Sequence, residues 1–409
     1  MSRQSLWSRA FVSLMMVNFC SALSFYLLMV KITEYAIVTY GVAYSVAGTM
    51  VSVYVIAALF TRMFFGGRID RWGVKRALFI GSAVNAAAML LYLVPMGFEA
   101  LLAVRVVHGF GFAIMSGSAA AGAALVIPRD RYGEGIGYFS MMQALATGIG
   151  PFVAILVTNL SEGYVPLFGV SAVIAVLAML LVLAVRIPDT GARVVHVGTV
   201  DRDSGCDANE GEERRRPNRG IGRFLHLPVV PISSVMFLMY LGYSGILSFV
   251  TVYADESGLS DAVSLYFVVY AIVILVSRPP VGRRVDRKGE NSTIYFCFAA
   301  LALGFVFLAF AVNGLLLLAS AAFAGFGIGA TQSTIQAVIA RDTPIDELGK
   351  ANSTFFMSMD LGSGVGPVVI GAFIPVVGYS SCYLALGVIA ILAGVLYYFV
   401  HGRHGAIRG

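Results

Sequence analysis

The chain contains the stretch Arg62-Met-Phe-Phe-Gly66-Gly-Arg68-Ile-Asp70-Arg71-Trp-Gly73, which follows one long apolar segment and precedes another. A second version, Arg278-Pro-Pro-Val-Gly282-Arg-Arg-Val-Asp286-Arg287-Lys-Gly289, occupies the same place in the other half of the sequence. The two copies begin 216 residues apart (278 − 62 = 216). A signature that recurs between apolar segments indicates that the chain contains an internal repeat.

Two further pairs of motifs keep the same offset. They are Gly109-Phe110-Gly111 with Gly325-Phe326-Gly327, and Gly148-Ile149-Gly150-Pro151 with Gly364-Val365-Gly366-Pro367. Because three separate motifs share one register, we interpret the chain as a duplication of one ancestral unit.

The composition indicates that both halves lie in a membrane. Of the 409 residues, 58% are hydrophobic and only 12% are charged, whereas charged residues make up about a quarter of a typical soluble protein. Apolar runs long enough to cross a hydrocarbon core of about 30 Å recur along the whole sequence. Since no water is available there to bond the backbone, these runs should be helices.

We therefore expect an all-α membrane protein with twelve transmembrane helices in two pseudo-symmetric six-helix bundles. The expected spans are 10–32, 40–65, 77–95, 98–126, 135–159, 163–186, 228–253, 261–281, 292–312, 314–340, 350–376 and 379–401. Residues 1–186 form the N-terminal bundle, 187–227 a cytoplasmic charged linker and 228–409 the C-terminal bundle. The mixed charge of the linker predicts a flexible tether, and its Arg214-Arg215-Arg216 run leaves a lipid-binding role open.

Basic residues predict the orientation, because Lys and Arg concentrate on the cytoplasmic side. Apart from Lys31 and Arg105, we expect the basic residues to share one face, and the opposite loops carry Glu34, Glu99, Glu162, Asp255, Glu256 and Asp261. This places both termini and the linker in the cytoplasm, in a multi-pass protein of the cell inner membrane. The formal charge of +6 is explained by this topology, so no nucleic-acid partner is expected. Four scattered cysteines suggest neither a metal site nor a disulfide framework.

Three stretches resemble the major facilitator superfamily, nearest its twelve-helix drug/proton antiporter branch. They are the loop signature with Gly66, Asp70, Arg71, Gly73 and Arg76, the segment Leu101-x-x-x-Arg105-x-x-His108-Gly109, and Gly148-x-Gly150-Pro151. The resemblance covers essentially the whole chain outside the linker and implies a secondary transporter that works by alternating access.

The loop signature is expected to act as a conformational latch. Gly66 and Gly73 would allow a tight turn, and Asp70 could meet the positive end of a neighbouring helix. The resemblance implies that this helix is the eleventh, in the other half, with Arg71 and Arg76 completing a charge network. Asp286 and Arg287 are the second-half counterparts. The alternative is that the cluster serves only to set topology.

Small residues and prolines in the fifth and eleventh spans are expected to permit close packing and hinge motion. This set comprises Gly148, Gly150, Pro151, Gly364, Gly366 and Pro367. The resemblance implies that the fifth span lies beside the eighth and the eleventh beside the second. A nucleotide-binding role is excluded because the glycines lie within helices, with no preceding strand and no phosphate-binding lysine.

Charged residues inside the hydrocarbon are costly and therefore point to function or to a partner. Asp360 is either a proton carrier or a polar tie to the second span, and Arg105 either binds an anionic group or holds helices together. His108 is either a titrating group or packing, and Glu34 forms with Lys31 either a gate-side or an exposed ion pair. The proton-coupling candidates are thus Asp360, His108 and Glu34.

The first helix of each three-helix unit is expected to line a central cleft. With Arg105 and His108, the substrate-binding candidates are Asn18, Tyr26, Tyr240, Tyr243, Gln332 and Gln336. An aromatic, amide-rich lining suits a small amphiphilic organic solute better than a polyanion, although each side chain could instead tie helices together.

We expect a secondary active transporter that exports such a solute or a drug, in antiport with protons. The alternative is proton-coupled uptake of a sugar, organic acid or other metabolite. An enzyme is not expected, because no catalytic grouping occurs, and no cofactor or metal is implied. The expected partners are the solute, protons and membrane lipid, with the protein a monomer.

The latch hypothesis predicts an asymmetry between the two signature aspartates. Asp70→Asn should lower transport severely, whereas Asp286→Asn should do less, because Glu290 and Asn291 stand where the first copy has basic residues. Transport by each purified variant in liposomes measures this. Full activity in both variants would reduce the motif to a topology signal.

Overall fold

The computed structural model describes residues 6–128, 131–161, 163–185, 225–343 and 347–403. Their secondary structure is helical, and it divides into long helices joined by short connections. The helices are α1 (Arg9–Tyr40), α2 (Tyr44–Trp72), α3 (Val74–Leu91), α4 (Phe98–Val126), α5 (Tyr132–Ser161), α6 (Val165–Ala184), η3 (Leu227–Val229), α7 (Val230–Glu256), α8 (Ser260–Lys288), α9 (Glu290–Ala309), α10 (Gly314–Asp342), α11 (Leu348–Tyr397) and the π-helical turn η4 (Tyr398–Gly402).

The last long helix is two helices in sequence. Gly378 interrupts α11 with a left-handed φ of 77° and a ψ of 166°, a conformation that a residue with a side chain rarely adopts. The described chain therefore has twelve long helices, and the break falls between the predicted spans 350–376 and 379–401. The fold prediction is confirmed. Eleven apolar segments are long enough to cross a membrane when the two parts of α11 are taken together.

The first helix is longer than its apolar run suggested. The Ser8 hydroxyl accepts a hydrogen bond from the Phe11 amide at the start of α1, and Gly41 ends the helix in the left-handed conformation at φ 63°. The predicted span ends at residue 32, but α1 continues to Tyr40 because Lys31, Glu34 and Ala36 are buried against neighbouring helices.

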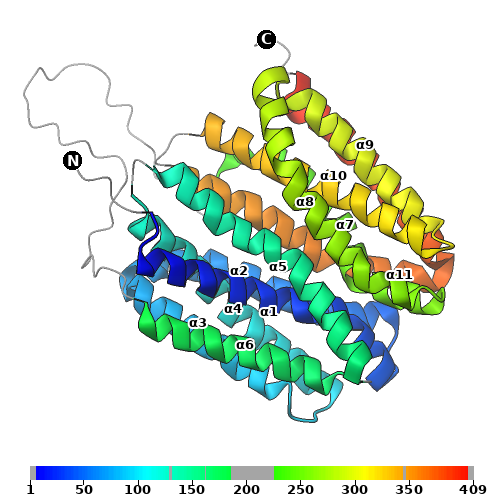
Figure 1. Cartoon of the computed structure of the whole chain (residues 1–409), viewed down its shortest axis with the longest axis horizontal. Helices are drawn as coiled ribbons and strands as arrows, with labels where there is room; N and C mark the ends of the chain where they lie inside the picture. The colour runs from blue at the N-terminus through cyan, green and yellow to red at the C-terminus, as the bar shows by residue number, and fades with distance from the viewer. Residues whose placement is uncertain (1–5, 129–130, 162, 186–224, 344–346, 404–409) are drawn as a thin grey trace, which may run out of the picture.

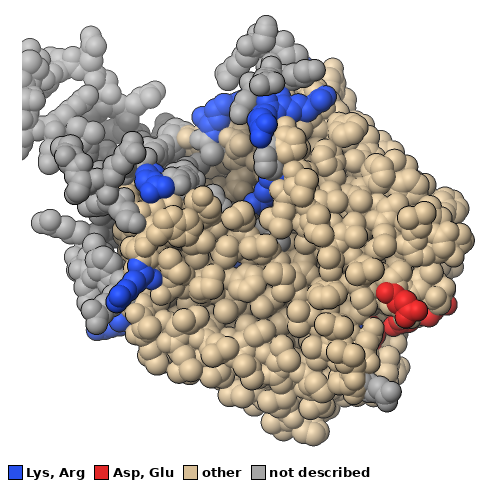
Figure 2. All heavy atoms as spheres, viewed as in Figure 1, with Lys and Arg blue, Asp and Glu red and all other residues tan. Residues whose placement is uncertain are grey.

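The helices form two groups that follow the duplication. In Figure 1, α1–α6 lie on one side and α7–α11 on the other, and α5 lies beside the second group. We call the end at which α6 finishes and α7 begins the linker end, and the opposite end the far end. Exposed Lys and Arg side chains gather at the linker end and acidic side chains at the far end (Figure 2), where Asp255, Glu256 and Asp261 are exposed.

The two groups meet closely at two crossings where one partner is glycine. A Cβ placed on Gly148 of α5 would collide with the Cβ of Ala271 in α8. A Cβ on Gly364 of α11 would lie 3.3 Å from the Cβ of Val55 in α2. Gly148 and Gly364 are related by the repeat offset, and so are Val55 and Ala271. The expectation that the fifth span lies beside the eighth, and the eleventh beside the second, is met.

Further contacts join the groups at the far end. The Tyr44 hydroxyl of α2 donates to Glu256 of α7 at 2.5 Å, and the Thr251 hydroxyl of α7 donates to the Val30 carbonyl of α1 at 3.3 Å. A Cβ on Gly48 of α2 would lie 2.5 Å from the Pro367 carbonyl oxygen of α11. The described contacts of this half thus hold the far ends of α2 and α7 to the opposite group.

A pair of matched alanine substitutions tests the close crossing. Gly148→Ala should lower Tm because its methyl group meets Ala271, and overpacking of this kind costs about 1–3 kcal/mol. Gly169→Ala in α6, where nothing lies within 4 Å of the new Cβ, should leave Tm unchanged or raise it slightly, since alanine favours helix over glycine by about 1 kcal/mol. Thermal unfolding in detergent measures both. Equal shifts would show that the crossing tolerates a side chain.

Candidate functional site

One ion pair joins the two groups near the middle of the helices. The Arg62 Nη1 of α2 donates to the Asp360 Oδ2 of α11 at 2.5 Å. The side chains are 26% and 25% exposed, so neighbouring side chains do not fully enclose the pair. Of the two interpretations of Asp360, a tie to the second span agrees with this geometry.

Aromatic rings surround this ion pair. The Arg62 guanidinium lies over the Phe112 ring at 5.8 Å from its centroid. Asp360 interacts electrostatically with the hydroxyls of Tyr26, Tyr54 and Tyr240. Tyr26 and Tyr54 belong to the first group of helices and Tyr240 to the second, so the carboxylate lies where both groups contribute side chains.

Several predicted substrate-binding residues come together beside Asp360. The Tyr240 hydroxyl donates to Gln332 Oε1 of α10 at 3.0 Å, and the rings of Tyr240 and Tyr243 lie 5.5 Å apart. Tyr243 stacks on Tyr270 of α8 with 5.7 Å between centroids. Tyr26 interacts with both Tyr240 and Tyr243. We call Tyr26, Tyr240, Tyr243, Tyr270 and Gln332 the tyrosine cluster.

The remaining lining candidates are placed differently. Gln336 is half-buried one helical turn beyond Gln332 toward the linker end. Asn18 donates from Nδ2 to the Phe139 carbonyl of α5 at 3.1 Å and is only 6% exposed. Asn18 therefore ties α1 to α5, which agrees with the alternative that this side chain holds helices together instead of binding substrate.

Arg105 and His108 lie inside the first group of helices and away from Asp360. Arg105 Nε donates to the Met50 carbonyl of α2 at 2.6 Å, and its guanidinium lies 4.6 Å from the Tyr54 ring centroid. His108 Nδ1 lies 3.3 Å from the Tyr92 hydroxyl. Arg105 is 1% exposed and His108 is 0% exposed. These two buried side chains therefore join α4 to α2 and to the end of α3. The ion-pair partner of Asp360 is instead Arg62, and the contacts of Arg105 agree with the alternative that it holds helices together.

Lys31 and Glu34 form a buried ion pair toward the far end. Lys31 Nζ lies 2.7 Å from Glu34 Oε2, and their side chains are 5% and 10% exposed. The exposed alternative for this pair is therefore wrong, because α1 continues past it and neighbouring helices cover it. The Tyr164 hydroxyl donates to Glu34 Oε1 at 2.8 Å, and burial together with the nearby carboxylate raises the pKa of that hydroxyl.

For most of the two copies of the loop signature, the structure describes the backbone and not the side chains. Gly73 and Gly289 both have positive φ, 83° and 74°, so the final glycine of each signature makes the turn. Gly66 lies inside α2 and not in the turn, because the helix runs on to Trp72. The side chains of Asp70, Arg71, Asp286 and Arg287 lie outside the described residues. Arg76 is exposed at the start of α3.

The glycines and prolines of α5 and α11 lie at contacts between helices. A Cβ on Gly150 would approach Tyr26 of α1, and one on Gly366 would collide with the Ser244 hydroxyl of α7. Pro151 and Pro367 stand within their helices. Together with Gly148 and Gly364, these positions pack α5 and α11 against neighbours in both groups.

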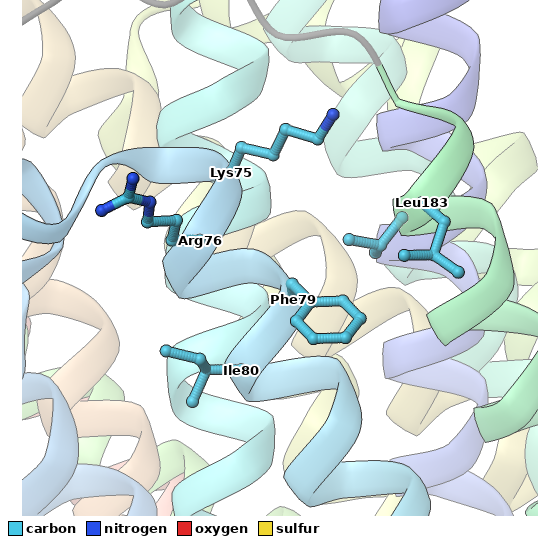
Figure 3. A pocket seen from close by; sticks show the side chains of 6 residues that line it. Lys75, Arg76, Phe79, Ile80 and Leu183 are labelled. Carbon is cyan, nitrogen blue, oxygen red and sulfur yellow. The ribbon is translucent and has the colours of Figure 1, made fainter.

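A separate groove lies on the outside of the first group, between α3 and α6. It has a volume of about 330 Å³ and is lined by Lys75, Arg76, Phe79, Ile80, Val182 and Leu183. In Figure 3, Lys75 and Arg76 lie above Phe79 and Ile80 on α3, and Leu183 of α6 lies across from them. This combination of basic and apolar side chains suits membrane lipid, and the groove shares no residue with the tyrosine cluster.

Two residues of the central region, Arg62 and Arg278, were not among the predicted site residues. They lie within the predicted spans 40–65 and 261–281 but were counted with the basic residues that set topology, whereas the structure places them well inside α2 and α8. The signal was available, because each arginine opens its copy of the repeated signature and follows an apolar run directly.

Two repeated bundles of membrane-spanning helices, with polar side chains from both gathered at the centre, define a membrane transport protein. The model of the Major Facilitator Superfamily matches residues 14–341 and 232–406. The chain therefore belongs to the Major Facilitator Superfamily, and it is a transporter of a small molecule and not an enzyme.

Known relatives agree with this membership. The staphylopine export protein of Staphylococcus aureus is 22% identical over 364 residues, covering 87% of each chain. The multidrug resistance protein MdtG of Proteus mirabilis is 26% identical over 169 residues, covering 40% of this chain and 42% of the relative. A crystal structure of a POT family transporter with a thioalcohol-conjugated peptide shares the fold, with a TM-score of 0.76, 13% identity and coverage of 97% and 96%.

The Arg62–Asp360 pair predicts a thermodynamic coupling. Arg62→Gln and Asp360→Asn should each lower Tm, because each leaves one charge without its partner. Since the pair is a quarter exposed, the cost should stay below the roughly 3–5 kcal/mol of a fully buried broken pair. The double variant should recover most of the loss. Additive losses in thermal unfolding would show that the two charges are energetically independent.

Proposed function

We propose that this protein exports a small amphiphilic organic solute from the cytoplasm across the cell membrane, in antiport with protons. Membership of the superfamily supports transport, and the names of two relatives, a staphylopine exporter and a multidrug resistance protein, support the outward direction. The basic linker end would face the cytoplasm, as the distribution of positive charge predicts.

The observation that carries the proposal is the Arg62–Asp360 ion pair beside the tyrosine cluster. Among the described residues, Asp360 is the one carboxylate in the middle part of the helices, and its partner belongs to the other bundle. Protonation of Asp360 would remove its charge and weaken a bond between α2 and α11. A proton could thereby change how firmly the two bundles hold together, which is the requirement for coupling proton binding to a conformational change.

The tyrosine cluster supplies the surface for the solute. Its rings offer apolar area with hydroxyl groups at their edges, and its members come from α1, α7, α8 and α10. A solute held between the two bundles would be released when the bundles rock. Because Tyr26 and Tyr240 lie within electrostatic reach of Asp360, solute and proton would influence each other at short range.

Proton movement in liposomes tests this proposal. The protein is reconstituted with a pH-sensitive dye inside, and amphiphilic organic acids, amines and neutral compounds are added outside one at a time. We expect an added substrate to drive protons opposite to its own movement. Asp360→Asn should abolish this proton movement while leaving exchange of labelled for unlabelled solute. Protons that move together with the solute would identify uptake by symport, and wild-type coupling in Asp360→Asn would reduce Asp360 to a structural tie.

A further inference from the structure

The duplication allows the two crossings to be compared position by position. Val55 meets Gly364 where α2 crosses α11, and Ala271 meets Gly148 where α8 crosses α5. Arg62 follows Val55 by the same number of residues as Arg278 follows Ala271, namely seven (62 − 55 and 278 − 271). Residues seven apart share one face of a helix. Arg278 therefore holds, at its crossing, the place that Arg62 holds at the other.

The partner of the arginine differs between the crossings. Asp360 precedes Gly364 by four residues, and the equivalent position before Gly148 is Ala144, which has no carboxylate. In the part of the chain that the structure describes, no acidic side chain forms an ion pair with Arg278, and its Nε is buried without a hydrogen-bond partner. The charge of Arg62 is thus balanced by Asp360, whereas no described carboxylate balances the charge of Arg278.

An unpaired arginine at this depth is costly. An Arg side chain in the hydrocarbon region is energetically unfavourable, and leaving a buried donor without an acceptor adds to the cost. An anion that binds next to Arg278 would relieve both costs. The side chain has the chemistry for this, since the planar guanidinium binds carboxylates through two parallel hydrogen bonds.

The surroundings of Arg278 match an organic acid. Tyr240 interacts electrostatically with Arg278, and its hydroxyl is bonded to Gln332. Tyr270, on the same helix as Arg278, stacks on Tyr243. If the charged group of a solute lay at the Arg278 guanidinium, the apolar part of the same solute could contact the aromatic rings of the tyrosine cluster.

We propose that Arg278 binds a carboxylate group of the transported solute, so that the substrates are amphiphilic organic acids or zwitterions. This deepens the proposed function and rests on it. Among the described residues, Arg62 and Asp360 cancel each other, and Arg278 adds one positive charge near the tyrosine cluster. A single positive charge suits a solute with one carboxylate better than a polyanion.

Binding to matched pairs of compounds tests this assignment without any gradient. The probes are indole-3-acetate, hippurate and N-acetylphenylalanine, each beside its uncharged amide, and the readout is the Tm of the purified protein in detergent. We expect the carboxylates to raise Tm more than their amides. Arg278→Gln should remove this preference, weakening carboxylate binding about tenfold or more, and Arg278→Lys should retain part of it. Arg283→Gln, an exposed arginine of the same helix, should behave as wild type.

A second variant keeps the test decisive if Arg278→Gln does not fold. Ala144→Asp restores the carboxylate that the other crossing has, and by pairing with Arg278 it should abolish the carboxylate preference while keeping the protein stable. Equal shifts for acids and amides in the wild type, or an undiminished preference in these variants, would overturn the proposal. The Tm shift on binding depends neither on a proton gradient nor on the direction of transport. A failure of antiport in liposomes would therefore overturn the proposed function without changing the outcome of this binding test.

Discussion

The close approach of helix backbones at two glycines sets the relation between the bundles. Gly148 faces Ala271 of the other bundle, and a methyl group on Gly148 would have no room. Gly364 faces Val55, and a methyl group there would have little room. In a membrane, where lipid is as apolar as the helices, packing of this kind supplies much of the association energy. The positions of the Arg62–Asp360 pair and of the tyrosine cluster follow from these two crossings.

Duplicated architecture does not require duplicated chemistry. The crossings have matching glycines and matching arginines. Within the described part of the chain, Arg62 has an acidic partner and Arg278 has none, and position 360 is aspartate where position 144 is alanine. The far end shows a similar specialisation, since the buried Lys31–Glu34 pair has a tyrosine partner in Tyr164 of its own bundle. In the proposed mechanism, symmetric packing would support the motion of the bundles, and asymmetric charge would contribute to selectivity.

Much of the fold could be predicted from the sequence, because a membrane leaves few alternatives. Length and hydropathy located the twelve spans, and the resemblance to the major facilitator superfamily implied that α5 lies beside α8 and α11 beside α2. The helix ends were less predictable, since α1 and α2 continue beyond their apolar runs to Tyr40 and Trp72. This extension is why Gly66 was expected in a turn and Arg62 close to the end of its span.

The site was predictable in its residue types and less so in its partners. Tyr26, Tyr240, Tyr243 and Gln332 were named, and they do meet. Arg105 and His108 were named too, but they face α2 and α3. Periodicity assigns a residue to a face of a helix, whereas which helix lies opposite depends on the rotation of that helix in the bundle. That rotation is fixed by the sum of many contacts, and no single motif records it.

Gly148 lies close to the middle of α5, and this has a mechanical consequence. At 1.5 Å per residue, about 24 Å of helix lies on its linker side and about 20 Å on its far side. In the proposed rocking motion, the crossing would therefore act as a fulcrum with arms of nearly equal length. A rigid tilt of about 10° about it would shift the two ends by about 4 Å in opposite directions. Such a tilt would widen one end of the space between the bundles and narrow the other by a comparable amount, without stretching a backbone hydrogen bond.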